Sequence, residues 1–254
     1  NVTGVQTCAL PILELSKIQY RDGHKDKAYQ IVDALNAKPV VSPPGLLLKS
    51  QYLSFEGKTD EAIVKAKAAV EADPKFVEGH YALGLYYSAK GDTKAAIASF
   101  NETVKLNPQA SVAQAQLARL QLVNGQAAAS VQLSEQALKN QPDSPEARLV
   151  YVRGLIATGD LSHAEAEIRR LQSTAPNSPA VYAQMGLLQL TRGNMALAKT
   201  AFTKALSLRP AFPDAVGGLI AIDLRNKDVA SARSRSDAAV ARSEEHTSEL
   251  QSRF

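Results

Sequence analysis

One spacing, 34 residues, recurs along nearly the whole chain and limits what the chain can fold into. Glycine, proline and alanine each return at this interval in a register of their own, without an insertion or a deletion. Repeats of this length indicate a small structural element that is copied and stacked, because one copy alone cannot bury its apolar side. The glycine register consists of Gly23, Gly57, Gly91, Gly125, Gly159 and Gly193.

The glycines and prolines predict where helices end. A glycine after a helix adopts the left-handed conformation at low cost, and a proline cannot continue a helix. We therefore expect two antiparallel helices in each repeat, and in the third repeat we expect them over Val77–Lys90 and Thr93–Leu106. The proline register is Pro74, Pro108, Pro142, Pro176 and Pro210, and the alanine register is Ala28, Ala62, Ala96, Ala164 and Ala198, with Ser130 in its one gap.

The third repeat carries the clearest motif. Its signature residues are His80, Leu83, Gly84, Tyr87, Ala96, Phe100 and Pro108. This order resembles the tetratricopeptide repeat (TPR), in which Trp, Leu, Gly and Tyr of a first helix are followed by Ala, Phe and Pro of a second. His80 stands where the family has Trp, and Lys227 stands where the last repeat should have its glycine.

The resemblance implies an all-α fold, a right-handed α-solenoid of stacked antiparallel helix pairs known as the TPR superhelix. It covers residues 13–241 as about seven 34-residue repeats, which start near residues 9, 43, 77, 111, 145, 179 and 213. Gly84 and Ala96 are small, so we expect the two helices of the third repeat to approach each other closely.

The two ends of the chain differ from this array. Residues 2–12 read VTGVQTCALPI and residues 242–252 read RSEEHTSELQS. These peptides are encoded by opposite strands of one oligonucleotide that resembles a common short-read sequencing adapter. We therefore expect residues 1–12 and 242–254 to be adapter-derived, and we exclude them from fold reasoning. Cys8, the one cysteine, then lies outside the repeat array. Because the native N-terminus is missing, the sequence does not decide between the bacterial cytoplasm and the periplasm.

Composition excludes several classes of protein. Hydrophobic residues make up 45% of the chain and charged residues 21%, a balance that argues against disorder. The net charge of +4 is spread along the chain, so we expect no nucleic-acid partner. No apolar run approaches the roughly 18 residues of a transmembrane helix, so we expect no membrane span in this segment.

No combination of residues points to catalysis. His24, His80 and His163 lie in different repeats and at different places within them. No glycine-rich phosphate loop follows a predicted strand, and no pair of acidic residues has a predicted pocket to share. We therefore expect no enzyme activity, no catalytic residue, no cofactor and no metal, and we interpret His80 as a packed, half-buried residue.

The resemblance also implies a binding surface. In TPR proteins the first helices line a concave groove with their second, fifth, sixth, ninth, twelfth and thirteenth residues. Arg119 and Arg153 share the ninth place in adjacent repeats, where they could form a short basic ladder for an acidic side chain of a bound peptide; pairing of either with Glu146 or another neighbour is the alternative. The candidate groove residues are Gln51, Tyr81, Leu85, Gln116, Arg119, Glu146, Arg153 and Gln184, with Glu78, Leu122, Leu149, Ile156 and Leu187 beside them.

These observations favour a non-catalytic scaffold for protein–protein interaction, which binds a peptide or a partner protein in the groove. The Ala-rich and Gln-rich repeats resemble TPR proteins of bacterial envelope and exopolysaccharide systems. The alternative is a TPR arm of a larger enzyme, a transferase or a peptidase, whose catalytic domain lies outside this fragment. RNA binding by helical-pair repeats of 35 residues is disfavoured by the strict 34-residue period. The sequence assigns no oligomeric state.

Overall fold

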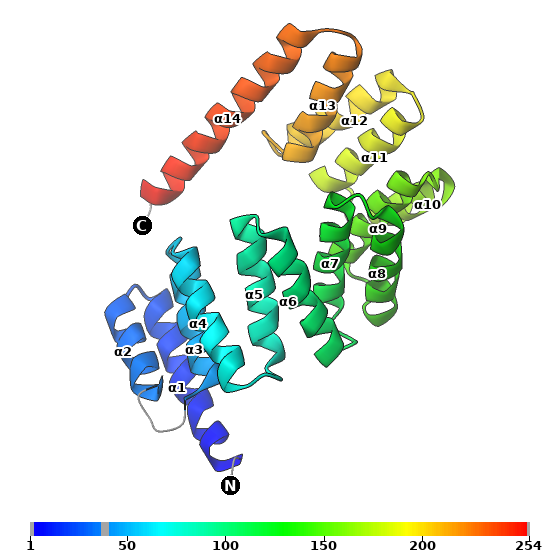
Figure 1. Ribbon diagram of the computed structural model, residues 1–254. Helices are drawn as coiled ribbons and strands as arrows, with labels where there is room; N and C mark the ends of the chain where they lie inside the picture. Colours follow the sequence, from blue (N-terminus) through cyan, green and yellow to red (C-terminus); the bar gives the residue numbers. More distant parts are fainter. Residues whose placement is uncertain (1–2, 37–40, 253–254) are drawn as a thin grey trace. The chain divides into compact units, whose positions relative to one another are not determined.

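The computed structural model describes residues 3–36 and 41–252, and side chains for 10–36 and 41–242. The described residues form 14 α-helices and no strand (Figure 1). The chain divides into two compact parts, the N-terminal part Asn1–Leu120 and the C-terminal part Gln121–Phe254. The helices are α1 (Thr3–Arg21), α2 (Lys25–Asn36), α3 (Pro43–Phe55), α4 (Thr59–Ala72), α5 (Val77–Lys90), α6 (Thr93–Leu106), α7 (Ser111–Val123), α8 (Ala127–Asn140), α9 (Pro145–Thr158), α10 (Leu161–Thr174), α11 (Pro179–Thr191), α12 (Met195–Leu208), α13 (Pro213–Arg225) and α14 (Val229–Ser252).

Helices α5 and α6 have the bounds that the sequence predicts for the third repeat. Gly91 ends α5 in the left-handed conformation, with φ of 80°. Asp92 then begins α6 as its N-cap, and its carboxylate accepts a hydrogen bond of 3.0 Å from the Ala95 backbone N–H. Asn107 caps the other end of α6, and Pro108 follows it directly. Local chemistry therefore sets the length of both helices.

The glycine register marks a required backbone conformation. All six of its members have positive φ, between 75° and 84°. In the last repeat Lys227 occupies the same place with a φ of 62°, so a side chain is held in a conformation that L-residues avoid. The turn geometry of the repeat is therefore kept even where its glycine is missing.

In the third and sixth repeats a phenylalanine ring of the second helix lies on a glycine of the first. In the third repeat Phe100 of α6 is fully buried, and a Cβ atom added to Gly84 of α5 would lie 2.5 Å from its ring. Phe202 of α12 lies in the same way against Gly186 of α11, and it also meets Gly218 of α13. Any side chain at these glycines would separate the helices.

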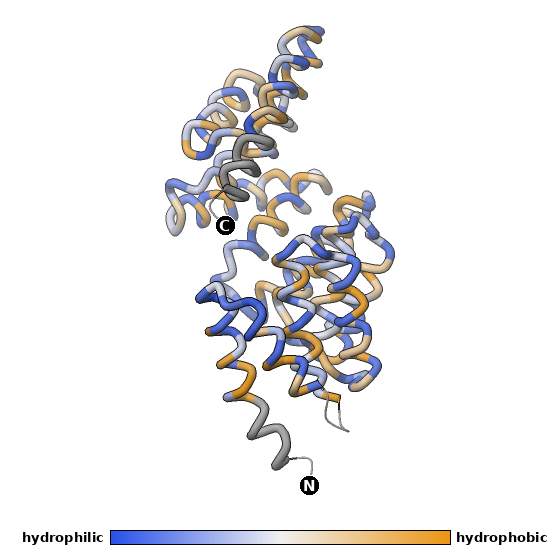
Figure 2. Tube along the Cα trace, turned by 90° about the vertical axis from the view of Figure 1, so that its left-hand side faces the viewer, coloured by the Kyte–Doolittle hydropathy of each residue, from blue (hydrophilic) through white to orange (hydrophobic). Residues whose placement is uncertain are grey.

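Neighbouring repeats share their apolar core within each part of the chain. In the N-terminal part the first helices α1, α3 and α5 contact one another in order, and α2 and α4 each contact the first helix that follows. In the C-terminal part α9, α11 and α13 form the corresponding row. Figure 2 shows polar and apolar residues alternating along these helices, as expected when one side of each faces a core.

Buried hydroxyl pairs link adjacent repeats of the N-terminal part. Tyr52 lies 2.9 Å from Ser16 of the preceding repeat, and Tyr86 lies 3.1 Å from Ser50, one repeat later along the chain. Each serine also bonds to a backbone carbonyl oxygen, Ser16 to that of Ala28 and Ser50 to that of Leu47. Burial raises the pKa of the Tyr86 hydroxyl, although its hydrogen bond with the serine acts in the opposite direction. These polar contacts satisfy buried hydroxyls.

Helices α1 and α14 extend past residues 13 and 241, the limits set for the repeat array by sequence, and α1 contains Pro11. Helical structure at these ends is compatible with a native origin of the two terminal segments and with an adapter-derived one. Their derivation from an adapter stays a prediction.

We predict that Lys227→Gly raises the free energy of unfolding by about 0.5–1 kcal/mol. The substitution removes the strain of a left-handed backbone at a residue with a side chain, and the greater conformational entropy of glycine in the unfolded chain offsets part of this stabilisation. The measurement is urea unfolding followed by circular dichroism. Gly159→Ala serves as the matched control, since the opposite change at an equivalent turn should lower stability by about 1 kcal/mol. Equal stability of Lys227→Gly and the parent would show that the turn carries no strain.

We also predict that Tyr86→Phe lowers the free energy of unfolding by about 0.5–1.5 kcal/mol, the usual net worth of one hydrogen bond. The Ser50 hydroxyl keeps its bond of 2.7 Å to the Leu47 carbonyl, so the variant leaves no buried donor without an acceptor. Tyr87→Phe, which removes a half-buried hydroxyl from the same helix, should cost less in the same unfolding measurement. A larger loss in Tyr87→Phe would contradict the role of the hydroxyl pairs.

Candidate functional site

A cavity of about 260 Å³ lies on the face formed by first helices of the C-terminal part. Most of the lining residues belong to first helices. Nearly all of these occupy the second, fifth, sixth, ninth or twelfth position of their repeat, which are positions that the sequence predicts to line a groove. Helix α11 supplies Ala183, Gln184, Leu187 and Leu190, α13 supplies Pro213, Asp214, Gly217, Gly218 and Ala221, and Arg153 and Phe202 come from α9 and α12.

The cavity runs from an exposed rim to a buried floor. Gly217 and Ala221 are exposed, whereas Phe202 and Ala183 are almost completely buried. Gly218 lies against the Phe202 ring, which leaves no room for a side chain there. A Cβ atom on Gly217, by contrast, would meet no atom within 4 Å, because that position faces the open cavity. Small residues on α13 therefore create the space.

Gln184 places a polar group at the floor. Its side chain is only 4% exposed, and its Oε1 atom is buried without a hydrogen-bond donor. A buried carbonyl oxygen left without a donor costs roughly 1–3 kcal/mol. The oxygen is itself buried, so a group in the cavity reaches it only if the Gln184 side chain moves.

Arg153 and Asp214 form an ion pair at the rim. The Arg153 guanidinium donates to the Asp214 carboxylate over 3.0 Å, and the two side chains are 49% and 38% exposed. The pair joins α9 to α13, the first helices of repeats on either side of α11. The sequence left two alternatives for Arg153, a basic ladder with Arg119 or an ion pair with a neighbouring carboxylate. In the structure Arg153 has an ion pair, and its partner is Asp214. Arg119 is exposed on α7 and belongs to the N-terminal part.

The structure thus brings two of the predicted groove residues, Arg153 and Gln184, to one cavity, together with Leu187. Glu146 is half-buried in the first turn of α9, and Gln116 is half-buried on α7. Ile156 is buried in the core and is not available to a ligand, because it packs with its own repeat and the next.

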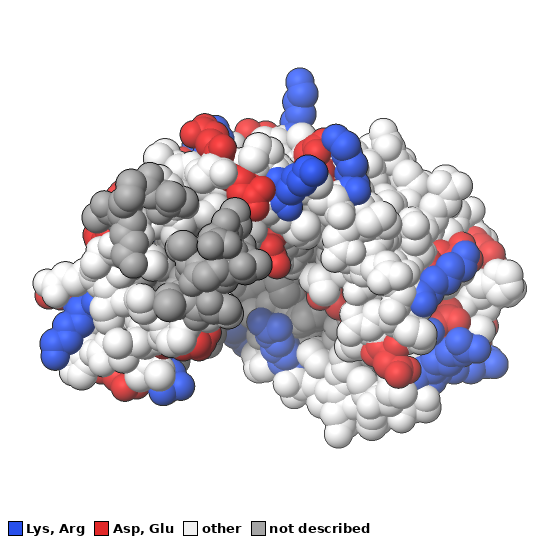
Figure 3. Space-filling view, turned by 90° about the horizontal axis from the view of Figure 1, so that it is seen from below, with Lys and Arg blue, Asp and Glu red and all other residues white. Residues whose placement is uncertain are grey.

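In the N-terminal part the predicted residues Gln51 and Tyr81 are half-buried, and Leu85 is exposed. The Tyr81 ring lies 5.7 Å from the ring of Phe100, so it supports the core as well as the surface. On the face shown in Figure 3 basic and acidic side chains are interspersed, and neutral atoms dominate. No large field of one sign favours a highly charged partner on this face.

Sequence reasoning missed an aromatic cluster in the N-terminal part. The rings of Tyr20 and Tyr52 stack at 4.0 Å, and Phe55, close to Tyr20, is 77% exposed. Burial raises the pKa of the Tyr20 hydroxyl, and the nearby Glu56 carboxylate raises it further. Tyr20 and Phe55 fall on the twelfth and thirteenth places of their repeats, so the groove positions themselves could have identified them.

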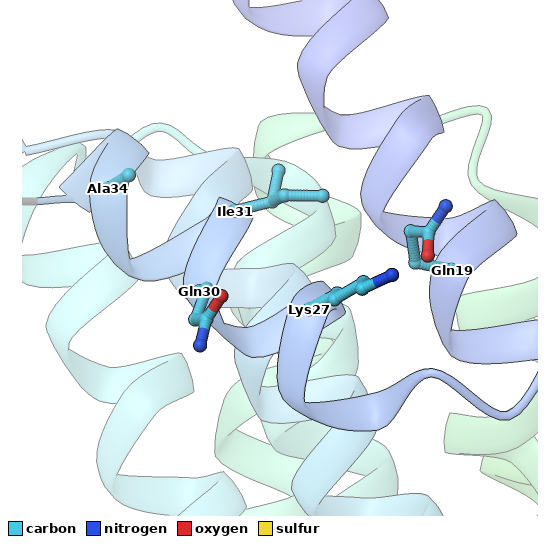
Figure 4. A pocket seen from close by; sticks show the side chains of 5 residues that line it. All are labelled: Gln19, Lys27, Gln30, Ile31 and Ala34. Atoms are coloured by element: carbon cyan, nitrogen blue, oxygen red, sulfur yellow. The ribbon is translucent and has the colours of Figure 1, made fainter.

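A second cavity of about 510 Å³ lies between α1 and α2. Figure 4 shows the side chain of Lys27 extending toward Gln19 across it. Gln30, Ile31 and Ala34 complete its lining, and the sequence predicts a groove role for none of its residues. The Gln19 Oε1 atom is also buried without a donor. All five lining residues belong to the first repeat.

Polar side chains at the place of the family's Trp have a structural role. His80 Nε2 lies 3.0 Å from the Pro74 carbonyl oxygen, Gln114 donates to Pro108 over 2.9 Å, and Arg148 donates to Pro142 over 2.5 Å. In each case the acceptor is the proline six residues earlier. These side chains therefore hold the turn before the first helix, which accounts for His80 without a ligand.

Among the described residues no group of three or more His, Cys, Asp or Glu is placed to hold a metal ion. In the same residues no helix is both long enough and apolar enough to cross a bilayer.

Solved structures of low sequence identity share the fold. A tetratricopeptide repeat protein from Parabacteroides merdae matches with a TM-score of 0.77 and 19% identity, over 91% of each chain. YrrB, described as a TPR protein with an unusual peptide-binding site, has a TM-score of 0.56 and 18% identity over 68% of this chain and 89% of its own. PilW, described as a widely conserved type IV pilus biogenesis factor, has a TM-score of 0.62 and 18% identity over 78% and 91%. No curated protein matches the sequence.

Family models agree with the structural likeness. Three models described as tetratricopeptide repeat match residues 47–111, 121–188 and 179–212. These ranges together span more than half of the chain and include the lining of the cavity on α9, α11 and α12. With its helix pairs, its left-handed turns and these matches, the chain belongs to the tetratricopeptide repeat family.

Proposed function

We propose that this protein is a non-catalytic scaffold that binds a peptide segment of a partner protein along the face of its first helices. The observation that carries the proposal is the cavity between α9, α11 and α13, whose lining comes from groove places of three successive repeats. A site built from several repeats suits an extended ligand that contacts each repeat in turn.

The chemistry of the cavity supports a peptide as the ligand. Its walls are apolar, from Leu187, Leu190 and Phe202, so they favour burial of an apolar side chain by about 25 cal/mol for each Å² removed from water. Gln184 and the Arg153–Asp214 ion pair add polar groups to this lining. A few placed polar groups on an apolar surface are typical of sites that recognise a specific ligand.

We further propose that Arg153 contacts an acidic residue of the partner. Its present bond to Asp214 is partly exposed, and an exposed ion pair contributes only about 0.2–1 kcal/mol. A partner carboxylate could therefore replace Asp214 at little cost. A hydrogen bond between a charged pair that is shielded from water contributes more, about 1.5–3 kcal/mol.

A bacterial envelope system is the setting we propose. Ala-rich and Gln-rich repeats of this kind, and the structural likeness to PilW, support that choice. The test is to express the complete gene and to follow the protein by cell fractionation. Recovery from the periplasm or the membrane fraction would support the assignment, and recovery from the cytosol alone would contradict it.

The groove is tested by selecting peptides from a displayed random library on the parent protein and measuring their affinity by calorimetry. We predict that Arg153→Glu weakens binding of selected acidic peptides by about 10-fold or more, because a shielded charged contact is lost and a like charge is added. Asp214→Asn should strengthen the same peptides by about 2- to 5-fold, because Arg153 no longer has a competing carboxylate.

Arg170→Glu provides the matched control for charge, since Arg170 is an exposed arginine on the second helix α10. It should leave the affinity unchanged. If no peptide is selected, or if Arg153→Glu and Arg170→Glu bind selected peptides equally well, the groove assignment is wrong.

A further inference from the structure

We propose that α13 is a gate for the cavity: the helix unfolds locally and refolds onto α11 and α12, and a ligand binds only while α13 is folded. This inference rests on the proposed function, because it names how the same site is regulated. One wall of the cavity consists of residues from α13, namely Pro213, Asp214, Gly217, Gly218 and Ala221. Local unfolding of α13 would therefore remove that wall.

Strained backbone flanks α13 on both sides. Among the described residues, Ala211 and Lys227 are the two other than glycine that have positive φ, 61° and 62°. Ala211 lies two residues before α13, and Lys227 lies two residues after it. Residues with a side chain keep this conformation only where the surrounding structure imposes it. Local unfolding of α13 would release the strain at both positions.

Two consecutive glycines weaken the helix itself. Gly217 and Gly218 lie in the middle of α13. Glycine gains more conformational freedom on unfolding than any other residue, so it destabilises a helix relative to alanine. The Phe202 ring leaves no room for a side chain at Gly218, whereas a Cβ atom on Gly217 would meet no atom within 4 Å. Gly217 therefore weakens α13 although no packing contact requires a glycine there.

Few apolar side chains hold α13 in place. Those that it buries are Ala215, Leu219 and Ile222, whereas the first helix α9 buries Ala147, Val150, Val152, Leu155 and Ile156. Two ion pairs add to the contacts of α13, Asp214 with Arg153 of α9 and Asp223 with Arg235 of α14. Segments with few buried apolar contacts open at a lower free energy than the rest of a protein. We therefore expect α13 to open more readily than α9.

Opening of α13 competes with binding at the cavity. A ligand that binds only the folded form has an apparent dissociation constant that rises as the open fraction of the protein grows. The bound ligand in turn shifts α13 toward its folded form, because only that form offers the complete site. The stability of one helix would thus regulate the affinity of the groove.

The experiment measures how fast a buried thiol on α13 reacts with Ellman's reagent, which is a disulfide. Cys8, the one cysteine of the chain, is first replaced by serine. Ala215→Cys then places a thiol on α13, and Ala147→Cys places a matched thiol on α9, since each alanine is the third residue of its repeat and is 0% exposed. A buried thiol exchanges with the reagent only after its segment opens. We expect the Ala215→Cys thiol to react about 10-fold faster or more.

Relief of the strain should slow this reaction. In the Ala215→Cys chain, Ala211→Gly and Lys227→Gly should each slow labelling by about 2- to 5-fold, because glycine adopts the left-handed conformation readily. Gly217→Ala should slow labelling by a similar factor, about 2- to 5-fold, because alanine is the better helix former. Asn177→Gly is the matched control, since Asn177 holds the place of Ala211 one repeat earlier and is not among the residues with positive φ. It should leave the rate unchanged.

Equal labelling rates of Ala215→Cys and Ala147→Cys would overturn the inference. So would a rate that Ala211→Gly and Asn177→Gly change equally, or a rate that rises with urea as steeply as global unfolding does, because a local opening exposes little surface. Circular dichroism should report the same helix content for every variant and the parent. If Ala215→Cys loses helix content, Ile222→Cys supplies the thiol at another buried position of α13.

The link to binding is tested with a peptide selected on the parent protein. At ten times its dissociation constant, this peptide should slow labelling of Ala215→Cys by about 10-fold, the factor expected when it binds the folded form alone. A peptide that binds but does not slow the labelling would leave the groove in place and refute the gate. The labelling rates of the free chain judge the opening of α13, whereas the selection of peptides judges the proposed function, so the two can fail separately.

Discussion

Close packing between the two helices of a repeat is the constraint on which the rest of the structure depends, and in the third and sixth repeats a phenylalanine ring on a glycine provides it. Phe100 on Gly84 fixes how closely α5 and α6 approach. Phe202 extends the same contact across a repeat boundary, because it meets Gly186 of its own repeat and Gly218 of the next. Close packing of this kind allows little adjustment. The spacing between α11 and α13, and hence the surface that these two first helices present, depends on the Phe202 ring.

Much of the fold could be predicted from the sequence because its signals are local. Gly91, Asp92 and Pro108 set helix ends within a few residues of themselves, so the bounds of α5 and α6 followed from spacing alone. The left-handed turn at Lys227 was harder to predict, since the residue there disfavours it. In that turn the surrounding repeat geometry overrides the preference of one residue.

The candidate site was only partly predictable. Its positions followed from the place of each residue in the repeat, which identified Arg153 and Gln184. The ion pair of Arg153 and the burial of Gln184 could not be predicted, because both depend on contacts with residues distant in sequence. Arg153 bonds to Asp214, 61 residues away, and the burial of Gln184 depends on how α11 meets its neighbours. The hydroxyl pairs of Tyr52 and Tyr86 escaped notice for the same reason, since a serine and a tyrosine in successive repeats form no local motif.

Phe202 has two roles, since it joins α11, α12 and α13 and is also part of the cavity floor. A molecule resting on this ring would oppose the local opening of those three helices, because opening would release it. Repeat arrays open segment by segment, with free energies that differ along the chain. Occupancy would therefore slow amide hydrogen exchange in α11 to α13 and leave the exchange of α1 to α4 unchanged. Ligand binding would thus be visible as protection from amide hydrogen exchange that differs between the two parts of the chain.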